Sequence, residues 1–242
     1  ETGESVRRVV DIFNEVGNNF AVSSAGIGEA MLRSASALQT AGNTIEEAVS
    51  LIAAANAIVQ DPVKVGTALK TVSLRLRGVT DEGEEVANLV PKLEEQFSQI
   101  GLTLKKDENT FKSTYEIFKD LSEVWNELTD IQQANILELV AGKEQANVVA
   151  GLLINFQDAI KAYEVAQNSA GSATKEFEAS LDSFQTKISE FTNTVQLFWS
   201  NAINNDGAKA LISFATEIVN LLAKIVEHIS GVSLAAFVAT NA

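Results

Sequence analysis

The sequence predicts an all-α protein, and three observations support this prediction. Apolar residues recur at spacings of three and four along most of the 242 residues. The chain holds only two prolines, Pro62 and Pro91, which leaves room for long helices. No segment shows sustained alternation of apolar and polar residues, the pattern of a half-buried strand. We therefore expect a multi-helix domain followed by long amphipathic, coiled-coil-like helices.

Two helices are expected before Gly42. Apolar residues at helical spacing indicate a first helix that ends near Gly17-Asn18-Asn19, a sequence that favours termination. A second helix, rich in alanine and serine, is expected from about Ile27 to Ala41. Gly42 follows it directly, and glycine tolerates the left-handed backbone that commonly closes a helix.

Capping patterns mark the start of the next two helices. In Thr44-Ile45-Glu46-Glu47 the threonine hydroxyl can accept a backbone N–H while Glu47 reaches back, so a helix is expected from there to about Gln60. Asp61-Pro62 suits the start of a fourth helix, because proline in the first turn loses no hydrogen bond. That helix is expected to end at Gly78.

The segment between residues 79 and 110 is less regular and indicates a boundary. It begins with an acidic, glycine-interrupted stretch, and residues 102–109 are expected to form a loop or a short extended stretch. We expect a helical head domain over residues 5–110 and a long-helix region over residues 111–239. The ends indicate a piece of a longer protein, and residues 1–3 could be foreign to the natural sequence.

The chain is strongly helical from Phe111 onward. A capping box at Thr129-Asp130-Ile131-Gln132 predicts the start of one long helix, which ends where Gly171 and its neighbours break the pattern. The apolar face before this helix comprises Phe111, Tyr115, Phe118, Leu121, Trp125 and Leu128. The expected buried residues of the long helix include Leu137, Val140, Val148, Leu152, Phe156, Ile160 and Tyr163.

A strict heptad pattern follows the Gly171 break. Seven apolar residues are spaced alternately by four and three, with polar residues between them. The pattern favours one face of a helix in an intramolecular bundle, or else the seam of a self-associating coiled coil. A further apolar helix is expected between residues 208 and 239. The proposed packing seam consists of Phe177, Leu181, Phe184, Ile188, Phe191, Val195 and Phe198.

Composition argues against most enzyme classes. The absence of cysteine excludes a disulfide scaffold, thiolate zinc sites and a cysteine nucleophile. The single histidine, His228, excludes a multi-histidine metal site and lies among apolar residues. We expect no catalytic residue, no metal and no cofactor.

Charge argues against nucleic-acid binding. The formal net charge is −14, and phosphate backbones are held by lysine and arginine. One stretch without acids carries Lys64, Lys70, Arg75 and Arg77, but these fall on two different helix faces. We expect them to pair with the neighbouring acidic segment, residues 81–85, or with a partner.

A succession of short blocks carries a family resemblance. They are Val16-Gly17-Asn18-Asn19, Gly26-Ile27-Gly28-Glu29-Ala30-Met31, Arg33 to Leu38, Ala41-Gly42-Asn43-Thr44, Val59 to Gly78, Phe111 to Leu121, Trp125, and Leu128 to Asn135. In this order they resemble the core region of tape measure proteins from tailed phages and prophages. The resemblance covers about residues 5–200, and each block alone would be unspecific.

The resemblance implies a structural role rather than a reaction. Such proteins set tail length during assembly and lie in the lumen of the tail tube until DNA is ejected. The implied partners are further copies of the same chain, the tail tube protein, tail tip or baseplate proteins and tail assembly chaperones, with transient contact with the host membrane. The implied locations are the virion and, during assembly, the host cytoplasm.

Two other functions are compatible with the residues. The apolar region over residues 208–239 could insert into a membrane after release, although its charges speak against a stable span. The chain could also be an intracellular helical adaptor. For a tape measure protein, net negative charge in both halves would keep the chain from adhering to DNA in the same tube.

Overall fold

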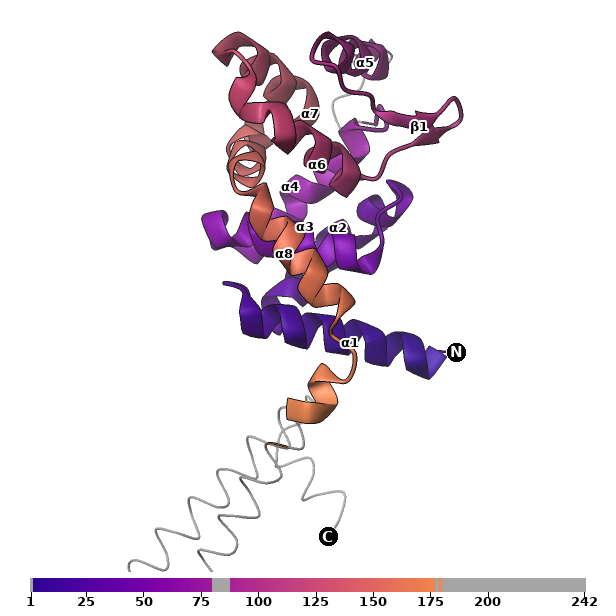
Figure 1. The fold of residues 1–242 in the computed structure, drawn as a ribbon, viewed down its shortest axis with the longest axis vertical. Coiled ribbons are helices and arrows are strands. Elements are labelled where there is room, and N and C mark those ends of the chain that lie inside the picture. The colour runs from indigo at the N-terminus through magenta and orange to yellow at the C-terminus, as the bar shows by residue number, and fades with distance from the viewer. Residues whose placement is uncertain (1, 80–87, 177–178, 180–242) are drawn as a thin grey trace, which may run out of the picture. The chain divides into compact units, whose positions relative to one another are not determined.

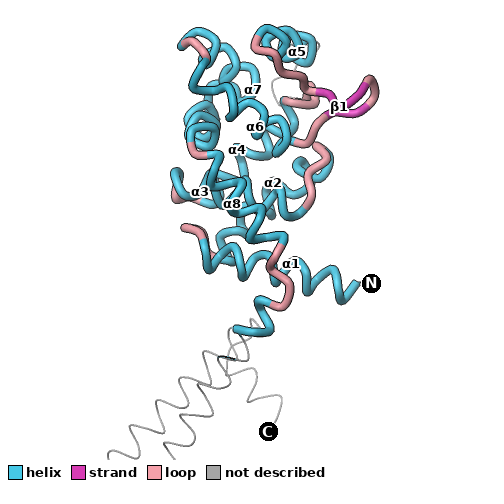
Figure 2. Tube along the Cα trace, in the orientation of Figure 1, coloured by secondary structure: helices cyan, strands magenta, loops and turns pink. Residues whose placement is uncertain are grey.

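The computed structural model describes residues 2–79, 88–176 and 179. The chain divides into two compact units, Glu1–Ala173 and Thr174–Ala242, and the fold below is that of the first unit. Its described residues are helical apart from one short β-hairpin, as Figure 2 shows, so the all-α prediction is confirmed.

The elements follow one another with short connections (Figure 1). They are α1 (Thr2–Asn19), α2 (Ser24–Thr40), α3 (Ile45–Val59), α4 (Pro62–Arg75), α5 (Leu89–Gln99), β1 (Lys105–Asp107), β2 (Thr110–Phe111), α6 (Thr114–Val124), a 3-10 turn (Trp125–Glu127), α7 (Asp130–Ile154) and α8 (Phe156–Gln167).

Most of the expected helix starts and stops are found in the first four helices, although α2 begins at Ser24 rather than Ile27 and α4 ends at Arg75 rather than Gly78. Thr44 and Glu47 form the capping box of α3, with the Glu47 backbone N–H donating to Thr44 Oγ1 over 3.2 Å. Asp61 caps α4 by accepting from the Lys64 backbone N–H, and Pro62 lies in the first turn. Gly42 follows α2 with a φ of +80°, a left-handed conformation that glycine adopts without strain.

Helices α2 and α4 approach each other so closely that one position has no room for a side chain. A Cβ added to Gly66 would lie 2.5 Å from the backbone oxygen of Ala30 and 2.9 Å from its Cα. Small residues line both helices here, with Ser34 and Ser73 also fully buried. Gly66 therefore sets the spacing of the two helices.

Helix α3 lies in the middle of the unit. Every residue from Ala48 to Asn56 is buried, so this helix is enclosed on all sides rather than on one face. Helix α8 packs along α3 and reaches α1, as the orange and indigo ribbons in Figure 1 show, while α7 packs on α4 and α3. Helices from both sides of residue 110 thus share one hydrophobic core.

The irregular segment contains one helix that the sequence analysis missed. Helix α5 carries Leu89, Leu93 and Phe97 on its buried face, a spacing of four, but it was obscured by Pro91 and the acidic stretch before it. The expected extended stretch is the hairpin of β1 and β2, which projects from the helices in Figures 1 and 2.

The single long helix expected after Thr129 is interrupted twice, which corrects the prediction. The capping box at Thr129 and Gln132 is present, but Gly142 has φ 65° and ψ −179°, and the chain breaks again at Asn155. At the first break, Arg75 of α4 donates to the backbone oxygens of Leu139 and Glu138 over 3.0 and 3.2 Å. A side chain from another helix therefore satisfies the carbonyls that an unbroken helix would pair internally.

Most of the expected apolar residues of this region lie in the core. Tyr115, Phe118, Leu121 and Trp125 are buried, as are Val140, Leu152 and Phe156. The remaining expected residues are partly buried and pack against the core: Phe111, Leu128, Leu137, Val148, Ile160 and Tyr163. Of these, Phe111 lies in β2 rather than on a helix.

Three aromatic rings join α6 to α8. The Tyr115 ring lies 5.2 Å from that of Tyr163 and 5.3 Å from that of Phe156, measured between centroids. Burial, followed by the nearby Tyr163 and two glutamates, raises the pKa of Tyr115 to about 12.

The Gly66 contact predicts opposite effects for two glycine substitutions. Gly66→Ala places a methyl group against the Ala30 backbone, which cannot move without shifting α2, so it should lower the free energy of unfolding by about 1–3 kcal/mol. The matched control is Gly28→Ala in α2, whose new Cβ would lie 3.9 Å from the Phe13 ring, an ordinary contact. Since alanine favours helix, Gly28→Ala should be neutral or raise that free energy by up to about 1 kcal/mol. Urea unfolding followed by circular dichroism measures both; equal effects would contradict the close approach.

The raised pKa of Tyr115 predicts an alkaline transition. The chain has two tyrosines, so Tyr163→Phe leaves Tyr115 as the only group whose phenolate absorbs in the ultraviolet. The folded variant should titrate well above 10, and its denatured form should titrate near about 10. Because the unfolded state ionises first, the free energy of unfolding should fall as pH rises from about 10 to 12. A folded-state midpoint at the ordinary tyrosine value would contradict the burial of this ring.

Candidate functional site

The predicted packing seam lies outside the described residues. Its members are Phe177, Leu181, Phe184, Ile188, Phe191, Val195 and Phe198. His228, the apolar region over residues 208–239 and the acidic segment 81–85 also lie outside them. The seam therefore stays a prediction.

The two arginines of the basic stretch bind backbone carbonyl oxygens. Arg75 binds the break in α7, and Arg77 Nη2 donates to the oxygens of Ala41 and Lys112 over 2.6 and 2.7 Å. The Arg77 guanidinium also lies 4.8 Å from the centre of the Phe111 ring. Lys64 pairs with Asp61 at the start of its own helix. The arginines thus connect elements within the fold and do not form a phosphate-binding surface.

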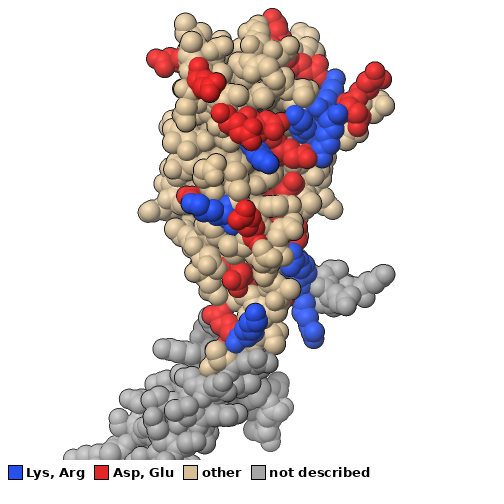
Figure 3. Space-filling view, in the orientation of Figure 1, with Lys and Arg blue, Asp and Glu red and all other residues tan. Residues whose placement is uncertain are grey.

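Acidic and basic groups alternate where the hairpin meets the helices, as the red and blue side chains in Figure 3 show. Lys105 pairs with Glu94, Lys106 with Glu116 and Lys112 with Asp120. Burial opposes ionisation of Glu116, but the hydrogen bonds from Lys106 and Ser113, together with the Lys106 charge, outweigh it and lower the pKa of that carboxyl. These pairs fix the hairpin to α5 and α6.

A second capping box faces the first across this region. Ser113 and Glu116 cap α6. Both residues lie close enough to Glu47 of the α3 box to affect the pKa of its carboxyl. Burial raises the pKa of Glu47, with the Glu116 charge adding to the effect. Both carboxylates accept backbone N–H groups at helix starts, which assigns them a structural role.

The described residues offer no recognisable catalytic centre. They contain no group of three acidic or histidine side chains arranged to hold a metal ion. A shallow depression of about 200 Å³ lies between α5 and α7. It is lined by Lys92, Glu95, Gln96, Asn135, Glu138 and Leu139. Within the described ranges, no helix is both long and apolar enough to cross a membrane.

The most elaborate polar arrangement lies where the first compact unit ends. We call it the α1 junction: Arg8, Asp11, Asn14 and Glu15 of α1, together with residues 166–173. Arg8 Nη2 donates to the backbone oxygens of Ala166 and Gln167 over 3.2 and 3.3 Å, and Nη1 donates to Ser169 Oγ over 3.3 Å. A cation therefore lies at the C-terminal end of α8, where the helix dipole favours positive charge.

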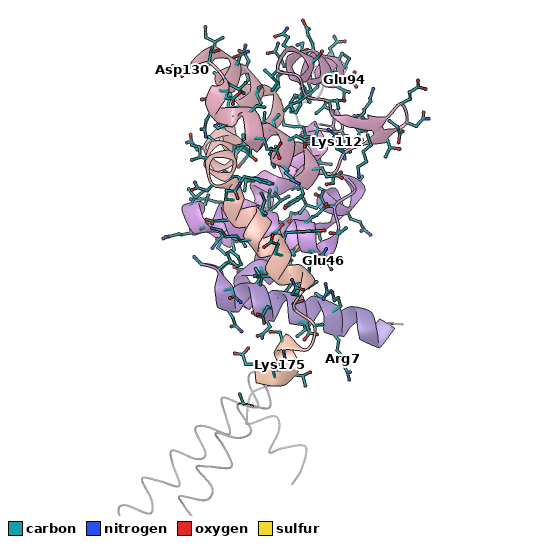
Figure 4. All side chains as sticks on the ribbon, viewed as in Figure 1. Arg7, Glu46, Glu94, Lys112, Asp130 and Lys175 are labelled. Atoms are coloured by element: carbon teal, nitrogen blue, oxygen red, sulfur yellow. The ribbon has the colours of Figure 1, made fainter. Side chains whose placement is uncertain are left out.

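Glu46 of α3 holds this arginine in place. Its carboxylate lies 2.9 Å from Arg8 Nη2, and the Glu46 side chain is only 15% exposed. Figure 4 labels Glu46 beside the lower end of α8, just above α1. The ion pair thus joins α1, α3 and the end of α8 at one point.

Asp11 binds the backbone on the C-terminal side of the break between α8 and residue 172. Its two carboxylate oxygens accept the backbone N–H groups of Gly171 and Ala173 over 2.9 and 3.1 Å. Residues 172–176 are helical, so Asp11 caps the start of this stretch from a different helix. Asn14 donates to Ser172 Oγ over 3.0 Å, and the Ser172 hydroxyl donates to Glu15.

Sequence reasoning missed the α1 junction. The apolar residues of the first helix predicted that helix, and Gly171 predicted a break, but neither pattern indicated a contact between the two segments. The available signal was the polar row Arg8, Asp11 and Glu15, at spacings of three and four on one helix face. No local pattern relates that row to residues about 160 positions later in the chain.

Comparison with known proteins places this fold in a family. No solved structure matches the chain. A relative described as "Probable tape measure protein", from Halomonas phage phiHAP-1, is 26% identical over 191 residues, covering 76% of this chain and 21% of its own length. The chain thus spans about a fifth of the relative that it matches. The profile of the family described as phage-related minor tail protein matches residues 2–142, more than half of the chain. The chain therefore belongs to the phage-related minor tail proteins, a family of phage tail structural proteins, and is tape measure-like.

Proposed function

We propose that this chain is a segment of a tail tape measure protein that sets tail length and lies in the lumen of the tail tube until DNA ejection. The observation that carries the proposal is the alignment of 191 residues with a probable tape measure protein. The role is structural, without a catalytic step. The described unit supports this role through its polar groups, which are engaged in capping helices and joining elements.

Helix geometry indicates which part of the chain could measure length. A helix rises about 1.5 Å per residue, so an extended helical segment converts residue number into distance. The first unit cannot do this while folded, since its helices pack around α3. We assign the ruler function to the heptad segment that begins at Phe177 and regard the first unit as a folded head.

The chemistry of the chain is compatible with a lumen that also receives DNA. A net charge of −14 disfavours adhesion to a phosphate backbone. Further copies of the chain, the tube protein, tip or baseplate proteins and assembly chaperones are the proposed partners.

Tail length in the parent phage tests the ruler function. In-frame deletion of the three heptads from Phe177 to Leu197 should shorten the tail by about 30 Å, and duplication of the same heptads should lengthen it by about 30 Å. Mean tail length in electron micrographs measures both changes. Unchanged length in both variants would contradict the assignment of the ruler to this segment.

The hairpin offers a control of matched size. Residues 107–110 at its turn are exposed, and such turns tolerate insertions. The control inserts flexible residues between Glu108 and Asn109, in a number equal to about three heptads. This insertion should leave tail length unchanged if the first unit remains folded in the particle. A tail lengthened by this insertion would show that the head is also extended along the tube.

A further inference from the structure

We infer that α1 is a removable strap that keeps the chain broken at Gly171, and that its withdrawal joins α8 to the next helical stretch as one continuous helix. Its consequence for the tail rests on the proposed function, because a head that opens in this way would contribute added length. The switch itself is a property of the chain and can be tested without the phage.

The strap occupies the groups that a continuous helix would pair internally. In an α-helix the oxygens of Ala166 and Gln167 would accept from residues 170 and 171, and Ala173 would donate to Ser169. In the structure Arg8 takes both oxygens, and Asp11 takes the N–H groups of Gly171 and Ala173. The two arrangements satisfy largely the same backbone groups, so they are alternatives.

The local sequence permits the continuous helix. Residues 156–176 contain no proline, and the break itself is Asn168-Ser169-Ala170-Gly171. Gly171 has a φ of +78°, the left-handed conformation that ends a helix in the strapped state. No heavy atom beyond the neighbouring residues lies within 4 Å of a Cβ added there, so an alanine at this position meets no steric obstacle from its surroundings.

The strap is held by polar contacts as well as by apolar burial. Ile12 and Val16 of α1 are fully buried and Phe13 packs against the core, whereas Val10 is 49% exposed. The rest of its attachment at the α1 junction consists of hydrogen bonds and the Arg8–Glu46 ion pair, which water can replace. Withdrawal of α1 therefore exposes less apolar surface than withdrawal of α3, whose central residues are all buried.

Gly171→Ala tests the inference in the purified chain. Alanine disfavours the left-handed state and favours helix, so it should shift the equilibrium toward the continuous helix by at least about tenfold. Adding Arg8→Ala and Asp11→Ala should increase the shift. The matched control is Gly42→Ala, at a φ of +80° with the same empty surroundings, where Arg77 of α4 and not α1 binds the oxygen of the preceding residue, Ala41.

The readout is the set of NMR Cα chemical shifts of residues 168–173. Helical shifts in the Gly171→Ala variants, with native shifts in α3, would support the switch. Random-coil shifts at these residues would overturn it, since the strap would then only order a loop. Unchanged shifts in the triple variant would overturn it as well.

A disulfide lock keeps the test decisive if those variants unfold. The chain has no cysteine, so Asn14→Cys with Ser172→Cys introduces a single pair at two residues whose side chains are hydrogen-bonded. Combined with Gly171→Ala, oxidation should suppress the helical shifts and reduction should restore them; identical spectra in both states would overturn the inference. The proposed function is tested separately, by the heptad variants in the phage. A switch observed in the purified chain, together with unchanged tail length in the heptad deletion and duplication variants, would contradict the proposed function and leave the switch intact.

Discussion

The contact of Gly66 with the Ala30 backbone fixes the position of α4, on which much of the remaining structure depends. Helix α4 supplies Arg75 to the broken α7, and its buried Ser73 hydroxyl lies 3.0 Å from that of Thr114 at the start of α6. A shift of α4 away from α2 would move both attachments. The absence of one side chain thus determines where the second half of the unit is placed.

Three arginines of this acidic chain connect distant segments by binding backbone oxygens. Arg8, Arg75 and Arg77 each donate to two backbone oxygens from distant segments. The planar guanidinium presents several donors in fixed directions, which suits carbonyl groups left unpaired where a helix ends. The positive charge of these three arginines is therefore used for internal connections.

The α1 junction gives the break after α8 a physical cause. Charge of opposite sign is placed at the two helix ends that meet there, Arg8 at the carbonyl end and Asp11 at the amide end. Both charges come from a helix near the N-terminus, so the start of the chain controls the point where the first compact unit ends.

The sequence by itself determined the helical class, the caps at Thr44, Asp61 and Thr129 and the apolar residues between 111 and 163 that face the core, because these depend on neighbours within one or two helical turns. Tertiary structure alone decided the breaks at Gly142 and Asn155, helix α5, which contains Pro91, and the α1 junction. A glycine break is stable only where another element satisfies the freed carbonyls, and Arg75 and Arg8 lie far away in the chain from the groups that they bind. Local periodicity carries no information about contacts of that separation.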